Sequence, residues 1–279
     1  MNIFNQHSIL NDFIDQNQTV GLVPTMGALH KGHMSLIERA LNENDQVIVT
    51  VFVNPTQFED LNDLKKYPKN LYDDVKMIEK VSPKIIIYAP ESNDLYESSI
   101  ISSSYEFGDI ENIMEGNIRV GHFQGVATIV EKLLTLLLPT NAYFGEKDFQ
   151  QLLIIKSLVV QKKISTAIIG CPIYRDNNGL ALSSRNSFLS ESEKNKAPFI
   201  FEQLKIARSL WGIESAKTII KRIKNSFLSN HNFKLDYFEI RFENNLLNAE
   251  KKSEKKVRAF IAAKLGKIRL IDNLALDEF

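Results

Sequence analysis

A strand, a glycine-bearing turn and the start of a helix follow one another near the amino terminus, and this succession constrains the fold more than any other feature. Residues 20–23 are an apolar run typical of a buried strand, and residues 24–33 read Pro-Thr-Met-Gly-Ala-Leu-His-Lys-Gly-His. Apolar residues then recur at helical spacing, at Leu36, Ile37, Ala40 and Leu41. The succession is the repeating unit of an α/β fold with a parallel sheet.

The turn of this unit carries residues suited to an anion. Gly27 can adopt a positive φ or let a ligand approach the backbone closely. The first amides of the following helix have no internal partner and suit a negative charge. His30 and His33 are three residues apart, so on a helix they share a face and can donate hydrogen bonds to phosphate oxygens. A β–α turn with two polar histidines and no ligand remains the alternative.

Polar side chains also follow the next predicted strand. Residues 46–53 are a β-branched run that is apolar on both faces, as expected of a buried parallel strand. Pro55 ends the run, and Asn54 and Gln57 lie at its carboxyl end, where open α/β sheets bind ligands. Residues 59–69 are polar and charged, and we expect a surface loop that is either a lid or an ordinary connection.

A third motif begins where a short strand, residues 141–144, runs into Gly-Glu-Lys-Asp-Phe-Gln-Gln at 145–151. Asp148 suits the N-cap of the next helix, and Gln151 completes a pattern like a capping box. A glycine followed by Lys147 at a strand–helix junction also suits a nucleotide phosphate. Both interpretations can hold together.

The fourth motif, residues 175–186, reads Arg-Asp-Asn-Asn-Gly-Leu-Ala-Leu-Ser-Ser-Arg-Asn. Its Asn-Gly step predicts a turn. Two serine hydroxyls and the Arg185 guanidinium can surround a triphosphate, although a serine-rich turn is the alternative. Beyond it, Ser190 and Glu193 form a capping-box pattern that opens a helix to about residue 211. Another helix at 215–228 and strands at 235–241, 257–263 and 267–272 complete an α+β portion.

The composition disfavours several classes of protein. The 279 residues contain 44% hydrophobic and 24% charged residues, which is typical of a soluble globular protein. Lys+Arg and Asp+Glu number 34 each, so a zero net charge disfavours a general nucleic-acid or membrane-surface binder. Cys171 is the single cysteine, so no intrachain disulfide is expected, and the amino terminus lacks a signal pattern. These features predict a cytoplasmic protein.

Taken in order, the motifs resemble the pantoate–β-alanine ligase family of the nucleotidyltransferase superfamily. Residues 30–33 match the His-x-Gly-His signature, residues 145–151 match Gly-Glu-Lys-Asp-x-x-Gln, and residues 182–185 match a second phosphate-binding signature. The resemblance extends over nearly the whole chain. The sequence departs from the family at 119–125, where Val120 and Gln124 replace the usual proline and arginine.

This resemblance implies an α/β fold with two domains. Residues 1–173 would form a Rossmann-like nucleotide- and pantoate-binding domain with a parallel sheet, and residues 174–279 a smaller α+β C-terminal lid domain. It also implies ATP-dependent condensation of (R)-pantoate with β-alanine, which gives (R)-pantothenate, AMP and diphosphate through a pantoyl adenylate. The implied enzyme uses ATP as a substrate together with Mg²⁺, and is a homodimer.

The resemblance assigns roles to matched residues. The implied catalytic residues are His30, His33, Lys147, Ser183, Ser184 and Arg185, with His33 as proton donor. The implied ATP-binding residues are Met26, Gly27, Ala28, Leu29, His30, Lys31, Gly32, His33, Gly145, Glu146, Lys147, Asp148, Tyr174, Leu182, Ser183, Ser184 and Arg185. The implied pantoate-binding residues are Asn54, Gln57 and Gln151. Gln57 would also contact β-alanine, and Asp148 would help place Mg²⁺ on the ATP phosphates.

Elementary chemistry agrees with these roles. A carboxylate with a pKa near about 4 is ionised at neutral pH, so its attack on ATP needs no general base. The difficulty is charge repulsion, which preorganised cations and donors relieve. A glutamine amide can bind the attacking carboxylate without neutralising it.

Two other functions remain open on the sequence. A nucleotidyltransferase acting on a phosphorylated acceptor would need cations where Gln57 and Gln151 stand. A non-catalytic nucleotide-binding protein would not need both histidines together with Lys147 and Arg185. An aminoacyl-tRNA synthetase is disfavoured by the zero net charge and by the lack of an evident tRNA-binding extension.

Overall fold

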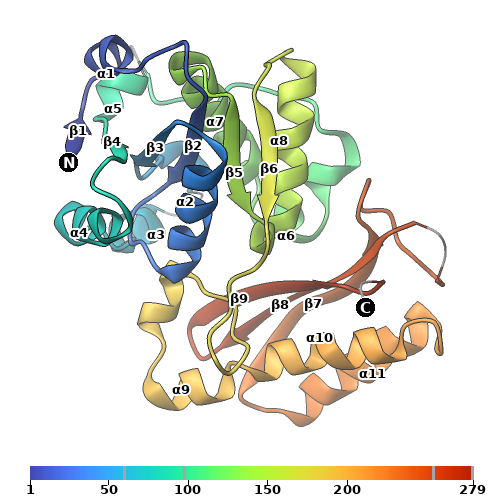
Figure 1. The fold of residues 1–279 in the computed structure, drawn as a ribbon. Helices are drawn as coiled ribbons and strands as arrows, with labels where there is room; N and C mark the ends of the chain where they lie inside the picture. The colour runs from blue at the N-terminus through green and yellow to red at the C-terminus, as the bar shows by residue number, and fades with distance from the viewer. Residues whose placement is uncertain (59–60, 97–98, 253–254, 278–279) are drawn as a thin grey trace. The chain divides into compact units, whose positions relative to one another are not determined.

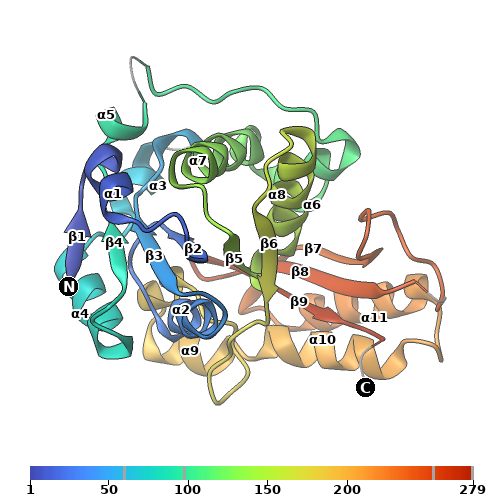
Figure 2. The same cartoon turned by 45° about the horizontal axis from the view of Figure 1, so that its top comes forward.

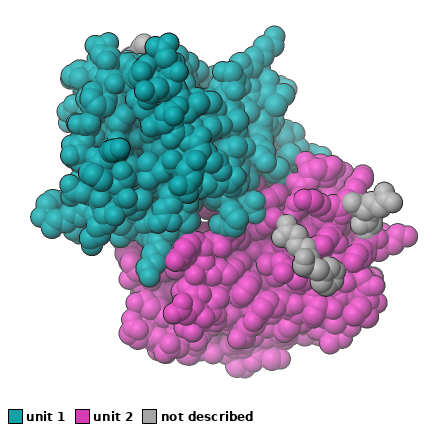
Figure 3. Space-filling model, in the orientation of Figure 1, with its two compact units in different colours: residues 1–146, 150–172 teal, residues 147–149, 173–279 magenta. Residues whose placement is uncertain are grey.

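The computed structural model describes residues 1–58, 61–96, 99–252 and 255–277. The chain divides into two compact units, coloured separately in Figure 3. The first comprises Met1–Glu146 and Gln150–Pro172, and the second comprises Lys147–Phe149 and Ile173–Phe279. Each unit has its own hydrophobic core. That the second acts as a lid stays a prediction.

The first unit is built on a six-stranded parallel sheet, which confirms the predicted α/β class (Figures 1 and 2). The strands are β1 (Asn2–Phe4), β2 (Val20–Thr25), β3 (Gln46–Val51), β4 (Ile86–Tyr88), β5 (Asn141–Gly145) and β6 (Ala167–Cys171). Their order in the sheet is β1-β4-β3-β2-β5-β6. The direction of strand succession therefore reverses beside β2, and the carboxyl ends of β2 and β5 form the switch point where such sheets bind ligands.

Helices cover both faces of this sheet because successive strand residues point to opposite sides. Val23 of β2 packs with α2 (Lys31–Glu43) and α4 (Leu71–Val81). Leu22, the preceding residue, packs with α1 (His7–Phe13), α7 (His122–Leu137) and α8 (Phe149–Gln161). The strands are apolar on both sides for this reason, as residues 46–53 predicted.

Short elements connect the main ones. They are η1 (Pro55–Gln57), α3 (Leu61–Lys66), α5 (Ser92–Leu95), η2 (Gly108–Asn112), α6 (Met114–Ile118) and η3 (Glu146–Asp148). The expected loop at 59–69 was therefore wrong in part, because residues 61–66 are helical despite their polar sequence. Residues 59–60 lie outside the described residues.

The second unit is an antiparallel three-stranded sheet packed against two helices. Strands β7 (Phe233–Phe242), β8 (Val257–Leu265) and β9 (Ile268–Ala275) lie in that order, with α10 (Phe199–Leu210) and α11 (Ala216–Ser229) in the same core. The single helix predicted from 190 to about 211 is two helices, α9 (Glu191–Lys196) and α10. Pro198 separates them because it has no N–H to continue the first. The Ser190–Glu193 capping box is confirmed, and η4 (Ser184–Phe188) precedes it.

Among the described helices, none has both the length and the apolar character needed to cross a membrane.

Replacement of a core residue of α2 tests this packing. Ile37 is fully buried, so Ile37→Ala should lower the free energy of unfolding by about 2–5 kcal/mol. Val160 on α8 is exposed, and Val160→Ala should change it by no more than about 0.5 kcal/mol. Urea unfolding followed by circular dichroism measures both. Equal effects of the two substitutions would contradict the described orientation of α2.

Candidate active site

A buried carboxylate holds the turn between β2 and α2. Gly27 and Ala28 have positive φ values of 79° and 50°, and the loop amides that follow point at Asp74 of α4. Asp74 Oδ2 accepts from the N–H of Ala28 at 3.1 Å, and its Oδ1 accepts from that of Leu29 at 2.7 Å. A Cβ on residue 27 would lie 2.8 Å from Asp74 Oδ2, so only glycine fits this approach. Burial raises the pKa of the Asp74 carboxyl, and the two N–H donors oppose that rise.

The two signature histidines cap α2 with their side chains. His30 is the N-cap residue, and its Nδ1 accepts from the N–H of Gly32 at 3.1 Å. His33 Nδ1 accepts from the N–H of His30 at 3.2 Å, which closes a capping box. The rings lie 4.0 Å apart between centroids. Because each Nδ1 is an acceptor, each neutral ring carries its proton on Nε2 and is a donor there.

The carboxyl end of β3 brings Gln57 to this turn. Gln57 lies in η1, and its Nε2 is 2.8 Å from Met26 Sδ. Asn54 stands behind it, 1% exposed, with its Nδ2 3.2 Å from Gln57 Oε1. A cavity of ≈ 490 Å³ lies next to Met26, lined also by Gly27 and Asp74. The structure thus joins the first two predicted motifs.

The start of α7 supports η1 from the other side. His122 Nε2 lies 3.0 Å from Arg119 Nη1, and because a guanidinium can only donate, the ring accepts there. Its Nδ1 therefore carries a proton, which it donates to the carbonyl oxygen of Gln57 at 2.9 Å. His122 is buried and holds a backbone group.

Gln124, which departs from the family pattern, has a local explanation. Its Oε1 accepts from the N–H of Tyr105 at 2.8 Å, and its Nε2 donates to the carbonyl of the same residue at 3.0 Å. Nε2 also donates to Glu111 Oε2 at 2.6 Å. An arginine could donate to the two oxygens but could not accept from Tyr105. The structure gives no reason for Val120, which is 73% exposed.

The segment after β5 carries Lys147 on the short helix η3. Gly145 ends β5, Glu146 begins η3, and Lys147 Nζ lies 3.8 Å from Asp148 Oδ2. Gln151, in the first turn of α8, is half-buried. The preceding Gln150 is buried and bonds the backbone of residues 110, 113 and 115.

The predicted second phosphate-binding segment lies in the second unit. The N–H of Leu182 donates to the carbonyl of Tyr174 at 3.0 Å. Ser183 caps η4, where its Oγ accepts from the N–H of Arg185 at 3.3 Å. Ser184 and Arg185 are half-buried on the same short helix.

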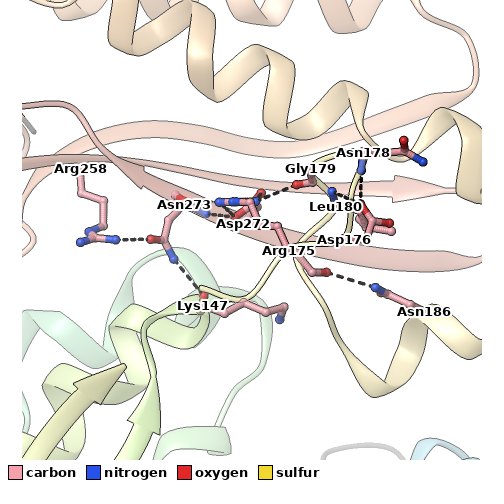
Figure 4. A network of polar contacts seen from close by, with 11 residues as sticks. Lys147, Arg175, Asp176, Asn178, Gly179, Leu180, Asn186, Arg258, Asp272 and Asn273 are labelled. Atoms are coloured by element: carbon pink, nitrogen blue, oxygen red, sulfur yellow. Dashed lines mark hydrogen bonds and ion pairs between the residues drawn. The ribbon is translucent and has the colours of Figure 1, made fainter. Parts of the chain in front are cut away.

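Two neighbouring residues of β9 hold both segments of the second unit (Figure 4). Arg175 makes two bonds to the buried carboxylate of Asp272, at 2.6 and 2.8 Å, and its Nη1 also donates to the carbonyl of Gly179. Burial raises the pKa of Asp272, while the guanidinium opposes the rise. Asn273 accepts from Arg258 Nη1 at 2.6 Å and donates to the carbonyl of Lys147 at 3.0 Å. Asp272 therefore positions the segment with the serines, and Asn273 positions Lys147.

The predicted site residues thus form two groups. Met26–His33, Asn54, Gln57, Gly145, Glu146 and Gln151 belong to the first unit, and Lys147, Asp148, Tyr174 and Leu182–Arg185 belong to the second. The sequence interpretation missed Asp74, Asn273 and Arg175 as supporting residues. One signal was present, because Asp74 stands four residues before the fully buried Ile78 and therefore on the inner face of α4.

Comparison with known proteins gives consistent matches. A family model described as pantoate-beta-alanine ligase matches residues 2–275. The pantothenate synthetase of Flavobacterium psychrophilum is 49% identical over 268 residues, 96% of this chain and 95% of that protein. That of Christiangramia forsetii is 46% identical over 282 residues, 99% of this chain and all of that protein.

Solved structures match along the whole chain as well. The pantothenate synthetase of Thermus thermophilus has a TM-score of 0.93 at 35% identity and covers 99% of both chains. The pantoate-beta-alanine ligase of Francisella tularensis, complexed with beta-gamma ATP and beta-alanine, has a TM-score of 0.82 at 37% identity. It covers 100% of this chain and 99% of that one.

Substitution of the carboxylate below the turn has a pH-dependent outcome. At about pH 4, Asp74→Asn should be less stable than the wild type. The amide NH2 group would face one of the two N–H donors and cannot accept, whereas both oxygens of a protonated carboxyl can. As the pH rises through the raised pKa of Asp74, only the wild type acquires a buried charge, so its advantage should shrink. Urea unfolding between about pH 4 and about pH 8 measures the difference.

Asp73→Asn is the matched control, since Asp73 is the exposed neighbour on the same helix. Its stability relative to the wild type should not follow the trend seen for Asp74→Asn. If the difference in stability between Asp74→Asn and the wild type stays constant or widens as the pH rises, the pKa of the Asp74 carboxyl is not raised.

Proposed function

Because the chain belongs to the pantoate-beta-alanine ligase family, we propose that it condenses (R)-pantoate with β-alanine at the expense of ATP. The products are (R)-pantothenate, AMP and diphosphate, with a pantoyl adenylate as the intermediate. The observation that carries the proposal is the capped turn after β2, where Met26 meets the amide of Gln57. Two histidine rings that are donors at Nε2, beside a side-chain amide that can bind a carboxylate, suit the first step of this reaction.

In the first step the pantoate carboxylate attacks the α-phosphorus of ATP. A bond forms between a carboxylate oxygen and phosphorus, and the bond to diphosphate breaks. In the first unit, residues 26–33 bind ATP together with Gly145 and Glu146, and His33 donates from Nε2 to the phosphates. In the second unit, Lys147 and Arg185 offset the charge of the departing diphosphate.

Other residues of the second unit complete the nucleotide contacts. Ser183 and Ser184 donate hydroxyl hydrogen bonds to phosphate oxygens, and Leu182 lines the nucleotide. Tyr174 contributes backbone rather than its phenol, which is partly exposed. Asp148 contacts the ribose or the metal.

Magnesium belongs to the proposal as a companion of the nucleotide. Among the described residues, no three His, Cys, Asp or Glu side chains cluster tightly enough to hold a metal ion. This fits Mg²⁺, which is commonly held by one or two carboxylates plus substrate phosphates. Asp148, half-exposed beside Lys147, is the residue that would contact it. When bound, the ion would offset phosphate charge.

In the second step the neutral amine of β-alanine attacks the carbonyl of the adenylate. A carbon–nitrogen bond forms and the carbon–oxygen bond to AMP breaks. Gln57 and Gln151 hold the pantoyl group, and Gln57 also contacts β-alanine. The position of Gln57 supports this assignment, because it is buried beyond the carboxyl end of β3, where its amide meets Met26 of the turn after β2.

We further propose a cytoplasmic homodimer, as the family resemblance implies. Cys171 is the single cysteine and cannot form an intrachain disulfide, which agrees with a reducing compartment. Light scattering of the purified protein would test the dimer.

The first test is pantoate-dependent exchange of labelled diphosphate into ATP, with Mg²⁺ and without β-alanine. Reversible formation of pantoyl adenylate should give exchange that requires pantoate. Addition of β-alanine should then release AMP and pantothenate in equal amounts. ATP binding without exchange would overturn the proposal and leave a non-catalytic nucleotide binder.

Paired substitutions at His33 separate its two functions. An asparagine oxygen can replace the Nδ1 acceptor, and a glutamine N–H can replace the Nε2 donor. His33→Asn should therefore keep the helix cap and lower the exchange rate by about 100-fold or more, whereas His33→Gln should keep more of the rate. The apparent Kd for ATP should change less than the rate in both. An unchanged rate in His33→Asn would remove the Nε2 donor from the mechanism.

A further inference from the structure

The side-chain amide of Gln57 has a fixed direction, and a backbone carbonyl of α7 sets it. Asn54 Nδ2 lies 3.1 Å from the carbonyl oxygen of Gly125. A carbonyl can only accept, so the atom of Asn54 that faces it must be the N–H donor. The orientation of the Asn54 amide is therefore determined by hydrogen bonding.

Close packing of α7 on η1 places that carbonyl. A Cβ on residue 125 would lie 2.2 Å from the carbonyl oxygen of Thr56 and 2.6 Å from the backbone nitrogen of Gln57. No side chain fits in this space, and glycine allows the two backbones to touch. Gly125 thus presents its backbone carbonyl to Asn54 as an acceptor, and this carbonyl cannot rotate away.

Two hydroxyl groups donate hydrogen bonds to the side-chain oxygen of Asn54. Its Oδ1 accepts from Tyr96 Oη at 2.6 Å and from Thr56 Oγ1 at 3.0 Å. A reversed amide would place Oδ1 against the carbonyl oxygens of Gly125 and the Gln57 side chain. Asn54 and Tyr96 are 1% and 4% exposed, so water does not offset such a repulsion.

The fixed orientation of the Asn54 amide in turn sets the orientation of the Gln57 amide. Its Oε1 accepts from Asn54 Nδ2 at 3.2 Å, so its Nε2 is directed at Met26 Sδ, a weak acceptor. His122 fixes the backbone of the same residue through its carbonyl. Gln57 therefore offers N–H groups at the turn after β2, where an oxygen of a ligand would be a better acceptor than sulfur.

We propose that Asn54 and Gly125 set the amide polarity of Gln57, so that this side chain selects an oxygen acceptor, a carboxylate or hydroxyl oxygen of the acid substrate. This rests on the proposed function, which assigns pantoate to Gln57. Asn54 is a positioning residue, because its side-chain N–H groups and oxygen are already bonded within the protein. A carboxylate in its place would reverse the polarity of Gln57, and an alanine would only release it.

The test compares Asn54→Asp with Asn54→Ala in the diphosphate exchange assay at about pH 8, where an aspartate is normally ionised. An ionised carboxylate at position 54 can bond Gln57 only through Nε2, which turns Oε1 toward the substrate. Asn54→Asp should raise the KM for pantoate by about tenfold or more, and by more than Asn54→Ala, with the KM for ATP within about twofold. Asn44→Asp is the matched control at the amino-terminal edge of the sheet, where Asn44 bonds Ala40 and Tyr143.

A pH profile separates polarity from packing. Below its pKa the new carboxyl of Asn54→Asp gains an O–H that can donate to Gln57 Oε1, so its KM for pantoate, divided by the wild-type value, should fall with falling pH. The titratable groups nearby include Tyr96, His122, Arg119 and Lys132. All are present in the wild type, so this ratio removes their effects. Asn54→Ala should show no such recovery.

Gln57→Glu gives a second measurement in case Asn54→Asp does not fold. The Asn54 donor satisfies one carboxylate oxygen, and the other faces the substrate as an acceptor, so the KM for pantoate should rise steeply. An Asn54→Ala effect on this KM as large as that of Asn54→Asp and independent of pH would overturn the inference alone. An unchanged KM in Gln57→Glu would overturn the inference together with the pantoate-binding role of Gln57. Absence of pantoate-dependent exchange in the wild type would overturn the proposed function and this inference with it.

Discussion

The contact of the Asp74 carboxylate with two loop amides is the interaction on which the candidate site depends. It holds Gly27 and Ala28 at positive φ, and this conformation directs the chain from β2 into α2. A turn built around a buried anion is costly unless donors surround it, and the loop supplies them. The helix start, its histidine caps and the position of Met26 beside Gln57 all follow from this turn.

Structural and chemical demands meet in the same side chains. His30 and His33 use Nδ1 to cap α2, so that Nε2 is the donor nitrogen of each neutral ring. Asn54 and His122 are buried and bonded to backbone, yet both act on Gln57. A substitution in such residues alters folding and recognition together, so the two effects must be separated by variants that replace one atom at a time.

Local patterns in the sequence predicted the α/β class, the strand–turn–helix unit and the Ser190 capping box, because spacing and propensity decide these features over a few residues. The helix at 61–66 was missed because its sequence is polar and offers no periodic apolar face. The partners Asp74, Gly125 and Asn273 were missed for another reason. Their hydrogen bonds join residues 45 or more positions apart, as in Leu29–Asp74, and local patterns carry no information on such pairs.

Asp272 and Asn273 are consecutive on β9, so their side chains leave the strand in opposite directions, one toward Arg175 and the other toward Lys147. Moving the strand by a single position along β8 would exchange these directions and break both attachments at once. The two-residue turn Gly266–Lys267, which joins the paired residues Leu265 and Ile268, sets that alignment. We therefore expect evolution to tolerate changes of residue type in this hairpin far better than insertions or deletions. The length of the hairpin determines the positions of the two segments that are predicted to bind phosphate.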